Sequence, residues 1–188
     1  IPKMYFQIYH ELYTLKKAGV SLHYMLGNHD YWIQDFISGQ LFDTIYKEDS
    51  IQDIHGKKFY LTHGDGIISW DVGYRILKAT IRNPVFIWLY RWIHPTIGFG
   101  FANWISKKGQ HYEHSDKHNE KILNELESFA KPHIANGVDY VITGHYHQAT
   151  DHSINEGKLL ILGDWIRYFS YGYFDGNDLT LKFWEADD

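Results

Sequence analysis

The sequence predicts one α/β domain, and three observations support this fold class. Three apolar runs with the character of strands each end in a glycine-punctuated cluster of polar residues, at positions 22–30, 59–66 and 138–147. Segments with helical periodicity lie before and between these runs, as in chains that alternate helices and strands. The length of 188 residues is enough for a single domain, 1–188, with a sizeable core.

The composition excludes several classes of protein. The formal net charge of −5 gives no basis for nucleic acid as a partner, because binding a phosphate backbone requires a basic surface. No apolar run approaches the roughly 20 residues needed to span a bilayer, and no signal peptide is visible. The chain has no cysteine, which excludes disulfides and thiolate metal sites, so we expect a cytoplasmic protein.

A helix and a strand are expected to precede the first polar cluster. Apolar residues recur at helical spacing over 4–15, and Gly19 follows them as a C-cap would. Residues 20–26 then alternate as a strand, which delivers Asn28 and His29 at its carboxyl end. A helix that feeds a strand is half of a βαβ unit, and the chain begins with Ile1 within the helix. We therefore expect a preceding strand that this sequence does not contain.

The second polar cluster follows a predicted hairpin. Residues 31–37 are typical of a short helix and 41–46 of a short strand. Residues 51–62 predict two strands that turn near His55 and Gly56. The second strand of this hairpin delivers His63 and Asp65 at its carboxyl end.

The stretch 70–108 is rich in aromatic residues and differs from the rest of the chain. A helix that starts near 72 is expected to break at Asn83-Pro84, and 85–93 is apolar on nearly all sides. The sequence alone favours a helical subdomain whose aromatic side chains pack on each other. The alternative is a lid over a lipid-bearing substrate, because the flanking cations suit an anionic amphiphile or membrane surface. These cations are Arg75, Lys78, Arg82, Arg91, Lys107 and Lys108.

The chain between this stretch and the third cluster is predicted to be a polar loop followed by a helix. Residues 110–119 are polar, and an amphipathic helix follows and is expected to end near Pro132. The loop contains three histidines within this polar stretch, for which we expect a solvated surface and not a metal site. They are His111, His114 and His118.

The third cluster carries two histidines two residues apart. Residues 138–143 are an apolar strand, and Gly144 allows the chain to turn before His145 and His147. Because positions i and i+2 project to the same side, the two imidazoles can face one metal or two adjacent metals. Further strands are predicted at 158–162, 166–174 and 179–184, the last two joined by the turn 175–178.

The three clusters resemble, in order, the last three signature blocks of the calcineurin-like metallophosphoesterases: Gly-Asn-His-Asp at 27–30, His-Gly-Asp at 63–65 and Gly-His-Tyr-His at 144–147. The continuation through 71–74, the tryptophan-rich stretch and Leu-Gly-Asp-Trp at 162–165 resemble the UDP-2,3-diacylglucosamine pyrophosphatases of lipid A biosynthesis. The resemblance covers nearly the whole chain. It implies an α/β/β/α sandwich that lacks its first strands and carries a helical lid insertion at about 70–110.

The resemblance also implies roles for individual residues. Asn28, His63 and His145 would bind one metal, and His147 would belong to the other. His29 would donate to the substrate phosphate or act as general acid, with Asp30 holding its ring. Positions that resemble substrate contacts of the family are Asp71, Tyr74 and Ser106.

The implied cofactor is a pair of divalent metal ions about 4 Å apart, which supply a nucleophile at neutral pH and hold the phosphate charge. Imidazole, amide and carboxylate ligands suit manganese, and iron or zinc as alternatives, better than calcium or magnesium. The superfamily also needs an Asp-x-His and a Gly-Asp from two earlier strands, which this sequence lacks. Asp53-Ile54-His55 has the spelling of the former but stands beside a turn, after the Asn-His-Asp block. We therefore expect incomplete metal sites and an inactive chain.

Three functions compete at this point. The first is hydrolysis of UDP-2,3-diacylglucosamine, a nucleotide-linked lipid, to UMP and 2,3-diacylglucosamine 1-phosphate, with peripheral contact at the inner membrane surface. The second is hydrolysis of another phosphodiester or nucleotide. The third is a non-catalytic scaffold that binds lipid or a partner. The sequence predicts no particular oligomeric state.

Overall fold

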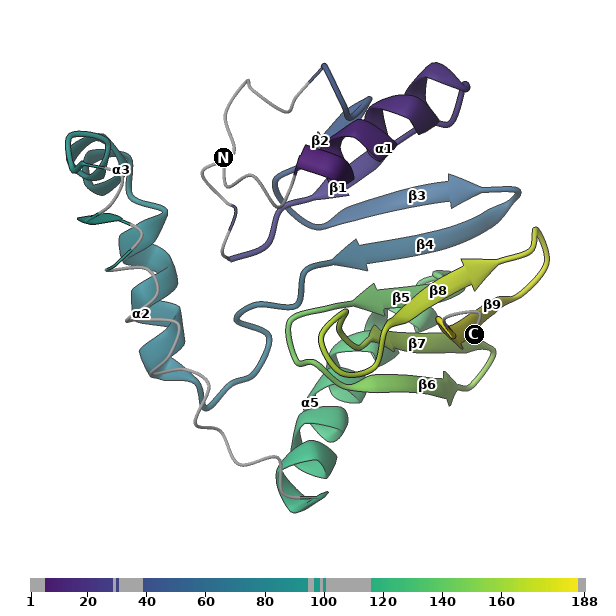
Figure 1. The fold of residues 1–188 in the computed structure, drawn as a ribbon. Helices are drawn as coiled ribbons and strands as arrows, with labels where there is room; N and C mark the ends of the chain where they lie inside the picture. Colours follow the sequence, from purple (N-terminus) through teal and green to yellow (C-terminus); the bar gives the residue numbers. More distant parts are fainter. Residues whose placement is uncertain are drawn as a thin grey trace.

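A computed structural model describes residues 6–28, 30, 39–94, 97–98, 100 and 116–185 (Figure 1). The expected helix at 31–37 and two of the predicted site residues, His29 and Ser106, lie outside these ranges. The architecture is a mixed sheet flanked by helices, which confirms the predicted α/β class.

The centre of the fold is a five-stranded sheet in the order β3-β4-β5-β7-β6. The middle strands β4, β5 and β7 are parallel, and β3 and β6 pair antiparallel at the two edges. The strands are β3 (Ser50–Ile54), β4 (Lys57–Thr62), β5 (Tyr140–Thr143), β6 (Ala149–Ile154) and β7 (Gly157–Leu162). The carboxyl ends of the parallel strands lie at the same end of the sheet, and this end carries the candidate site.

Both faces of this sheet are covered, as Figure 1 shows. On one face α5 (Asp116–Ala135) presents four buried residues, Ile122, Leu126, Ala130 and Ile134, at a spacing of four. They pack with side chains of β5, β6 and β7 into one core cluster. On the other face the hairpin of β8 (Ser170–Phe174) and β9 (Leu179–Phe183) packs through a second cluster. The predicted hairpin turn at 175–178 is confirmed.

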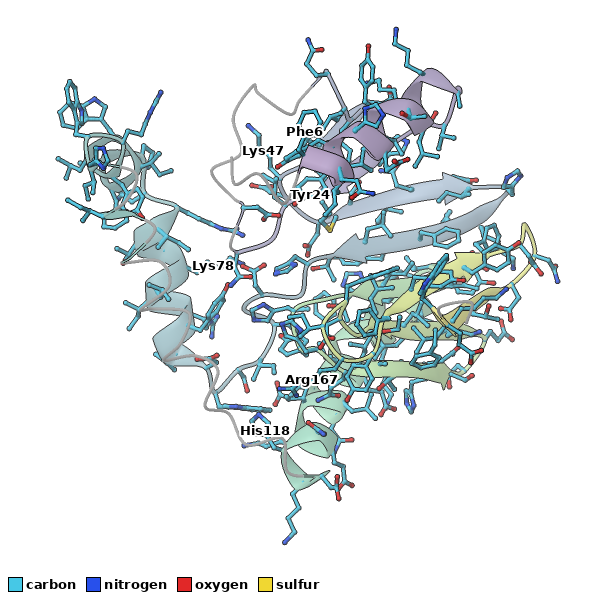
Figure 2. The ribbon with its side chains drawn as sticks, in the orientation of Figure 1. Phe6, Tyr24, Lys47, Lys78, His118 and Arg167 are labelled. Atoms are coloured by element: carbon cyan, nitrogen blue, oxygen red, sulfur yellow. The ribbon has the colours of Figure 1, made fainter. Side chains whose placement is uncertain are left out.

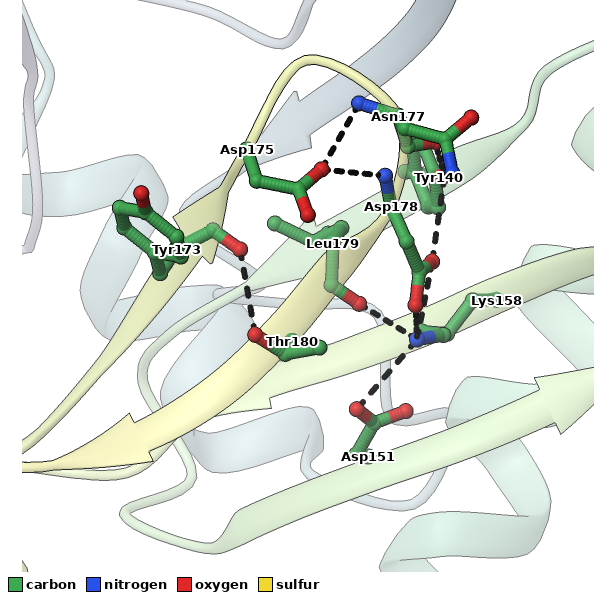
Figure 3. Close-up of polar contacts among 9 residues, drawn as sticks. All are labelled: Tyr140, Asp151, Lys158, Tyr173, Asp175, Asn177, Asp178, Leu179 and Thr180. Carbon is green, nitrogen blue, oxygen red and sulfur yellow. Dashed lines mark hydrogen bonds and ion pairs between the residues drawn. The ribbon is translucent and has the colours of Figure 1, made fainter.

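A polar network ties the β8–β9 hairpin to the amino-terminal end of β7 (Figure 3). The ammonium of Lys158 lies 3.4 Å from Asp178 Oδ1 and 3.5 Å from Asp151 Oδ2, and it also donates to the carbonyl of Leu179. Asp175 stabilises the turn, because its Oδ1 accepts from the backbone N–H groups of 177 and 178 at 2.8 and 2.9 Å. The polar side chains at this end of the sheet therefore stabilise the fold, and the candidate site lies at the opposite end.

The amino-terminal elements form a separate small layer. Helix α1 (Phe6–Lys17) ends before Gly19, whose φ of 89° is the left-handed C-cap that the sequence predicts. Strand β1 (His23–Met25) pairs in parallel with β2 (Thr44–Tyr46). The rings of Tyr24 and Phe42 stack at 4.8 Å beneath this pair.

Helices α2 (Val72–Ile81) and α3 (Pro84–Tyr90) project away from the sheets (Figure 1). The predicted break at Asn83-Pro84 is confirmed: the Asn83 side chain caps α3 by accepting from Val85 N at 2.9 Å, and Pro84 occupies the first turn. No helix within the described ranges is long and apolar enough to cross a membrane. That these helices form a lid remains a prediction.

Several local predictions were wrong. The helix expected to end near Pro132 continues to Ala135, because burying Ile134 against the sheet offsets the hydrogen bond that proline cannot make. It also begins at Asp116, within the expected polar loop. Residues 166–168 belong to a turn, and the strand expected to start at 166 begins at Ser170. The polar edge strand β6 was missed altogether.

Candidate metal centre

The segments that follow β1, β4 and β5 bring three predicted metal ligands together. Strands β4 and β5 are hydrogen-bonded neighbours, with Thr62 opposite Thr143, so His63 and Gly144 leave the sheet in the same row. His63 Nε2 lies 3.0 Å from Asn28 Oδ1, and the rings of His63 and His145 have centroids 5.1 Å apart. Residues from three distant stretches of sequence thus meet at one point.

This spacing fits a shared metal ion. With ligand bonds of 2.0–2.2 Å, neighbouring ligand atoms at a right angle lie about 3 Å apart, which matches the Asn28–His63 separation. Without a metal the same pair forms a hydrogen bond, in which the imidazole N–H donates to the amide oxygen. Within the described ranges no three histidine, cysteine or acidic side chains are grouped so as to hold a metal. The donor set found is one amide and two imidazoles.

Two glycines permit the close approach of these loops. A Cβ on Gly27 would lie 2.9 Å from Cε1 of His63, closer than a Cβ comes to a non-bonded atom in folded proteins. Gly64 has a φ of 96°, and a Cβ there would lie 2.2 Å from Thr143 Oγ1. The glycines of the first two clusters therefore make room for the His63 ring and for the contact between the β4 and β5 loops.

The loop after β5 has an uncommon backbone. Both His145 and His147 adopt left-handed conformations, with φ of 65° and 52°. Tyr146 between them is anchored, because its hydroxyl donates to the Gly64 carbonyl at 2.6 Å. Backbone strain of this kind gathers at functional sites, where the surrounding structure holds it in place.

Among the described residues, His147 contacts Asp164 and not the other three predicted ligands. Its Nδ1 lies 3.3 Å from Oδ2 of Asp164, and its side chain is 54% exposed. Burial opposes ionisation of Asp164, but backbone N–H groups of Arg167, Ile166 and Tyr168 hold its pKa below the usual range. Asp164 thus orients the imidazole with Nε2 directed away from the contact, as carboxylates behind metal-binding histidines do.

The predicted catalytic pair is described only in part. His29 lies outside the described residues, so its place relative to the metal ligands is not defined. Asp30 accepts hydrogen bonds from the backbone N–H of Gly27 at 2.5 Å and from the hydroxyl of Tyr24. Burial and Asp30 raise the pKa of Tyr24, which keeps its hydroxyl a donor. Asp30 therefore braces the loop that presents Asn28.

The two predicted substrate contacts within the described residues both lie on α2. Asp71 caps the helix, with its Oδ1 accepting from the Tyr74 N–H at 3.0 Å. The ring of Tyr74 lies 5.1 Å from that of His145. Sequence reasoning gave no role to Asp65, whose buried carboxylate contacts Tyr74 and Lys78 of α2 and Arg82 at its C-cap. The signal was present, since Tyr74, Lys78 and Arg82 follow one another at intervals of four.

An open cavity of about 560 Å³ lies beside His63. Its charged lining includes Lys47, Asp65, Lys78 and Arg82, and Thr62 contributes a hydroxyl-bearing side chain. A volume of this size is within the usual range of small-molecule sites.

The mixed sheet, with imidazole and amide donors beyond its strand ends, agrees with the class to which the chain is similar, the hydrolases that act on phosphoesters. The chain belongs to the calcineurin-like phosphoesterases, whose family model matches residues 4–149. It is 32% identical over 206 residues to a UDP-2,3-diacylglucosamine hydrolase of Porphyromonas gingivalis, a match covering 97% of this chain and 76% of that protein. A protein of the same name from Hahella chejuensis is 27% identical over 97% of this chain and 76% of its own length. One from Pseudomonas putida is 25% identical, in a match that covers 81% of this chain and 65% of that protein.

Proposed function

We propose that this chain provides the metal-binding and substrate-facing part of an enzyme that hydrolyses the pyrophosphate bond of UDP-2,3-diacylglucosamine. The products are UMP and 2,3-diacylglucosamine 1-phosphate, in the synthesis of lipid A. The observation that carries the proposal is the convergence of Asn28, His63 and His145 at the strand ends of a calcineurin-like phosphoesterase. The names of the relatives support the choice of substrate.

The metal ligands in this proposal are Asn28, His63 and His145, with His147 serving a second ion. Divalent ions, Mn²⁺ by preference, would supply a hydroxide nucleophile and offset phosphate charge when bound. Because the Asp-x-His and Gly-Asp blocks are absent from this sequence, metal analysis of the 188-residue chain after dialysis should find well below two ions per chain. Two tightly held ions would show that other residues replace the missing carboxylates.

The residues of this chain would hold the substrate from two sides. Tyr74 keeps its proton, because burial and then Asp65 raise its pKa. Its hydroxyl donates to Asp65, and its ring lies 5.1 Å from the ring of His145. The remaining predicted roles, with His29 as general acid beside Asp30 and Ser106 as a further substrate contact, stay parts of this proposal.

The acyl chains and the membrane surface would meet α3. Apolar side chains of α3 and of the turn after it are exposed, with Trp88 at 57% and Trp92 at 76%, and the centroids of these two rings lie 5.9 Å apart. Arg75 and Arg91 are also exposed nearby in the sequence. Exposed tryptophans with flanking cations are typical of peripheral contact with an anionic bilayer. Binding to phosphatidylglycerol vesicles should be weaker for Trp92→Ala than for the wild type. Equal binding of the variant and the wild type would exclude Trp92 from that contact.

The decisive assay follows UMP release from UDP-2,3-diacylglucosamine with Mn²⁺, using the protein as its gene encodes it. His63→Ala should lower turnover by about 100-fold or more, since it removes a ligand. His152→Ala is the matched control, because that histidine lies on β6 and contacts Glu127, away from the strand ends. Turnover that survives in His63→Ala would refute the site.

The two alternative functions give different results in the same assay. Hydrolysis of bis-p-nitrophenyl phosphate or nucleotides without action on the acylated substrate would favour a phosphoesterase of other specificity. Binding of the acylated substrate without hydrolysis, at saturating Mn²⁺, would favour the non-catalytic scaffold.

A further inference from the structure

Asp65 carries a buried carboxylate near the candidate site that is shared by two cations. Its side chain is 6% exposed and lies at the start of the loop that follows His63. Oδ2 of Asp65 lies 3.0 Å from Lys78 Nζ and 3.2 Å from a guanidinium nitrogen of Arg82, and it accepts from the Tyr74 hydroxyl at 3.2 Å. The Asp65 carbonyl accepts from Lys78 as well, at 2.7 Å. A buried carboxylate requires such partners, because an unpaired one is strongly destabilising.

The three partners of Asp65 all come from one face of α2. They are spaced by four residues, so they form a single row along two turns of the helix. Through Asp65, the loop after β4 therefore contacts side chains from the first turn of α2 to its C-cap. In Figure 2, Lys78 reaches from α2 toward this loop. None of the residues of α2 is fully buried.

The contacts of Asp65 also affect a residue beside the predicted metal ligands. The hydroxyl of Tyr74 is held by Asp65, and this fixes the tilt of the Tyr74 ring against the His145 ring at 5.1 Å. The same helix end carries Asp71, which caps α2. Without the Asp65 carboxylate, two cations would lose their shared partner and the Tyr74 hydroxyl would lose its acceptor.

We propose that Asp65 is a positioning residue: it locks α2 against the strand-end loop so that Tyr74 faces the His63–His145 pair. The inference rests on the proposed function only for its effect on substrate. Its role is to set the place of α2, because the metal ligands themselves are held by the ends of β4 and β5. Loss of Asp65 should therefore impair recognition of a large acylated substrate while leaving metal binding in place.

The test compares Asp65→Asn with Asp139→Asn. Asp139 is a suitable control, because it too pairs with a lysine but lies at the opposite end of β5, where it accepts from the backbone N–H of Lys58. Native-state hydrogen exchange of the metal-free protein should show at least about tenfold faster exchange of α2 amides in Asp65→Asn, with amides of β4, β5 and α5 unchanged. This measurement requires no activity, so it remains decisive if the proposed substrate is wrong.

Kinetics and a second variant complete the test. In Asp65→Asn the KM for UDP-2,3-diacylglucosamine should rise about tenfold, while Mn²⁺ affinity and kcat for bis-p-nitrophenyl phosphate stay within about twofold. Arg82→Gln, a milder change on the helix side, should give the same pattern, and the double variant should show less than the sum of the two effects. Unchanged α2 exchange in both single variants overturns the proposal. So does uniform loss of protection across α2, β4, β5 and α5, since Asp65 would then serve only general stability.

Discussion

Gly27→Ala tests how tightly the first and second clusters must approach. The new methyl group would lie 2.9 Å from Cε1 and 3.3 Å from Nδ1 of His63, and 3.2 Å from Oδ1 of Asp30. Ordinary contact begins at 3.4 Å, so the His63 ring must retreat by about 0.5 Å, which is the tolerance of a preorganised site. The ring can do so only by leaving its position 3.0 Å from Asn28.

Metal affinity is the quantity that should respond to this shift. Displacing one ligand should weaken Mn²⁺ binding by about 10- to 100-fold, or about 1.4 to 2.8 kcal/mol. The free energy of unfolding of the metal-free protein should change by less than about 1 kcal/mol, because a partly exposed side chain can yield without opening a cavity. Calorimetric titration with Mn²⁺ and urea unfolding measure the two quantities separately.

Gly73→Ala is the control for this experiment. Gly73 lies in α2, and a Cβ there meets nothing within 4 Å. The substitution should raise the free energy of unfolding by about 0.5 to 1 kcal/mol and leave Mn²⁺ affinity unchanged. Wild-type Mn²⁺ affinity in Gly27→Ala, with the fold intact, would show that His63 does not need its observed position to bind metal.

Three further predictions concern the core, the pH dependence of stability and the exposed histidine. Leu126→Ala should cost about 2 to 5 kcal/mol in urea unfolding, because this fully buried side chain joins α5 to the sheet; a cost below about 1 kcal/mol would contradict that packing. The Lys58 backbone N–H is the main cause that lowers the pKa of Asp139, so this carboxylate stabilises the fold above its unfolded pKa of about 3.9 and loses that effect as pH falls through the folded value. Asp139→Asn should thus be less stable than wild type at pH 7 and converge with it near pH 3, and a constant difference would refute the assignment. Asp164→Asn presents an N–H donor to Nδ1 of His147, which should move the imidazole proton to Nε2 and lower Mn²⁺ affinity by about tenfold or more; an unchanged ¹⁵N tautomer pattern would show that Asp164 does not set the ring.

Local sequence signals predicted the elements that depend on local chemistry. The hairpin at Gly56, the C-cap at Gly19 and the break at Asn83-Pro84 all follow from backbone preferences of a few residues, and all three are present. The convergence of the three clusters followed from a general rule about strand ends. Because each polar cluster directly follows a strand in the sequence, this rule predicts that the clusters meet without knowledge of individual side-chain contacts.

The features that were missed depend on contacts between distant elements. Helix α5 passes Pro132 because Ile134 beyond it is buried against the sheet, which no local pattern reports. Strand β6 is polar and exposed on an edge, and only its pairing with β7 makes it a strand. Residues 166–168 form a turn because the Asp164 carboxylate binds their three N–H groups. The role of Asp65 likewise required the position of α2.

The parallel pairing of β4 with β5 separates two kinds of sequence change. The chain leaves the sheet after Thr62 and re-enters it at Tyr140 in adjacent register, so the length of the excursion does not enter the distance between His63 and His145. Closing a longer loop is inexpensive, about 0.6 kcal/mol for each doubling, and helices there can be exchanged or extended without moving a ligand. Deleting one residue within β4 would instead shift His63 by about 3.3 Å and turn it to the other face of the sheet. Substrate preference can therefore diversify in the excursion, while the strands that carry the ligands tolerate no change in length.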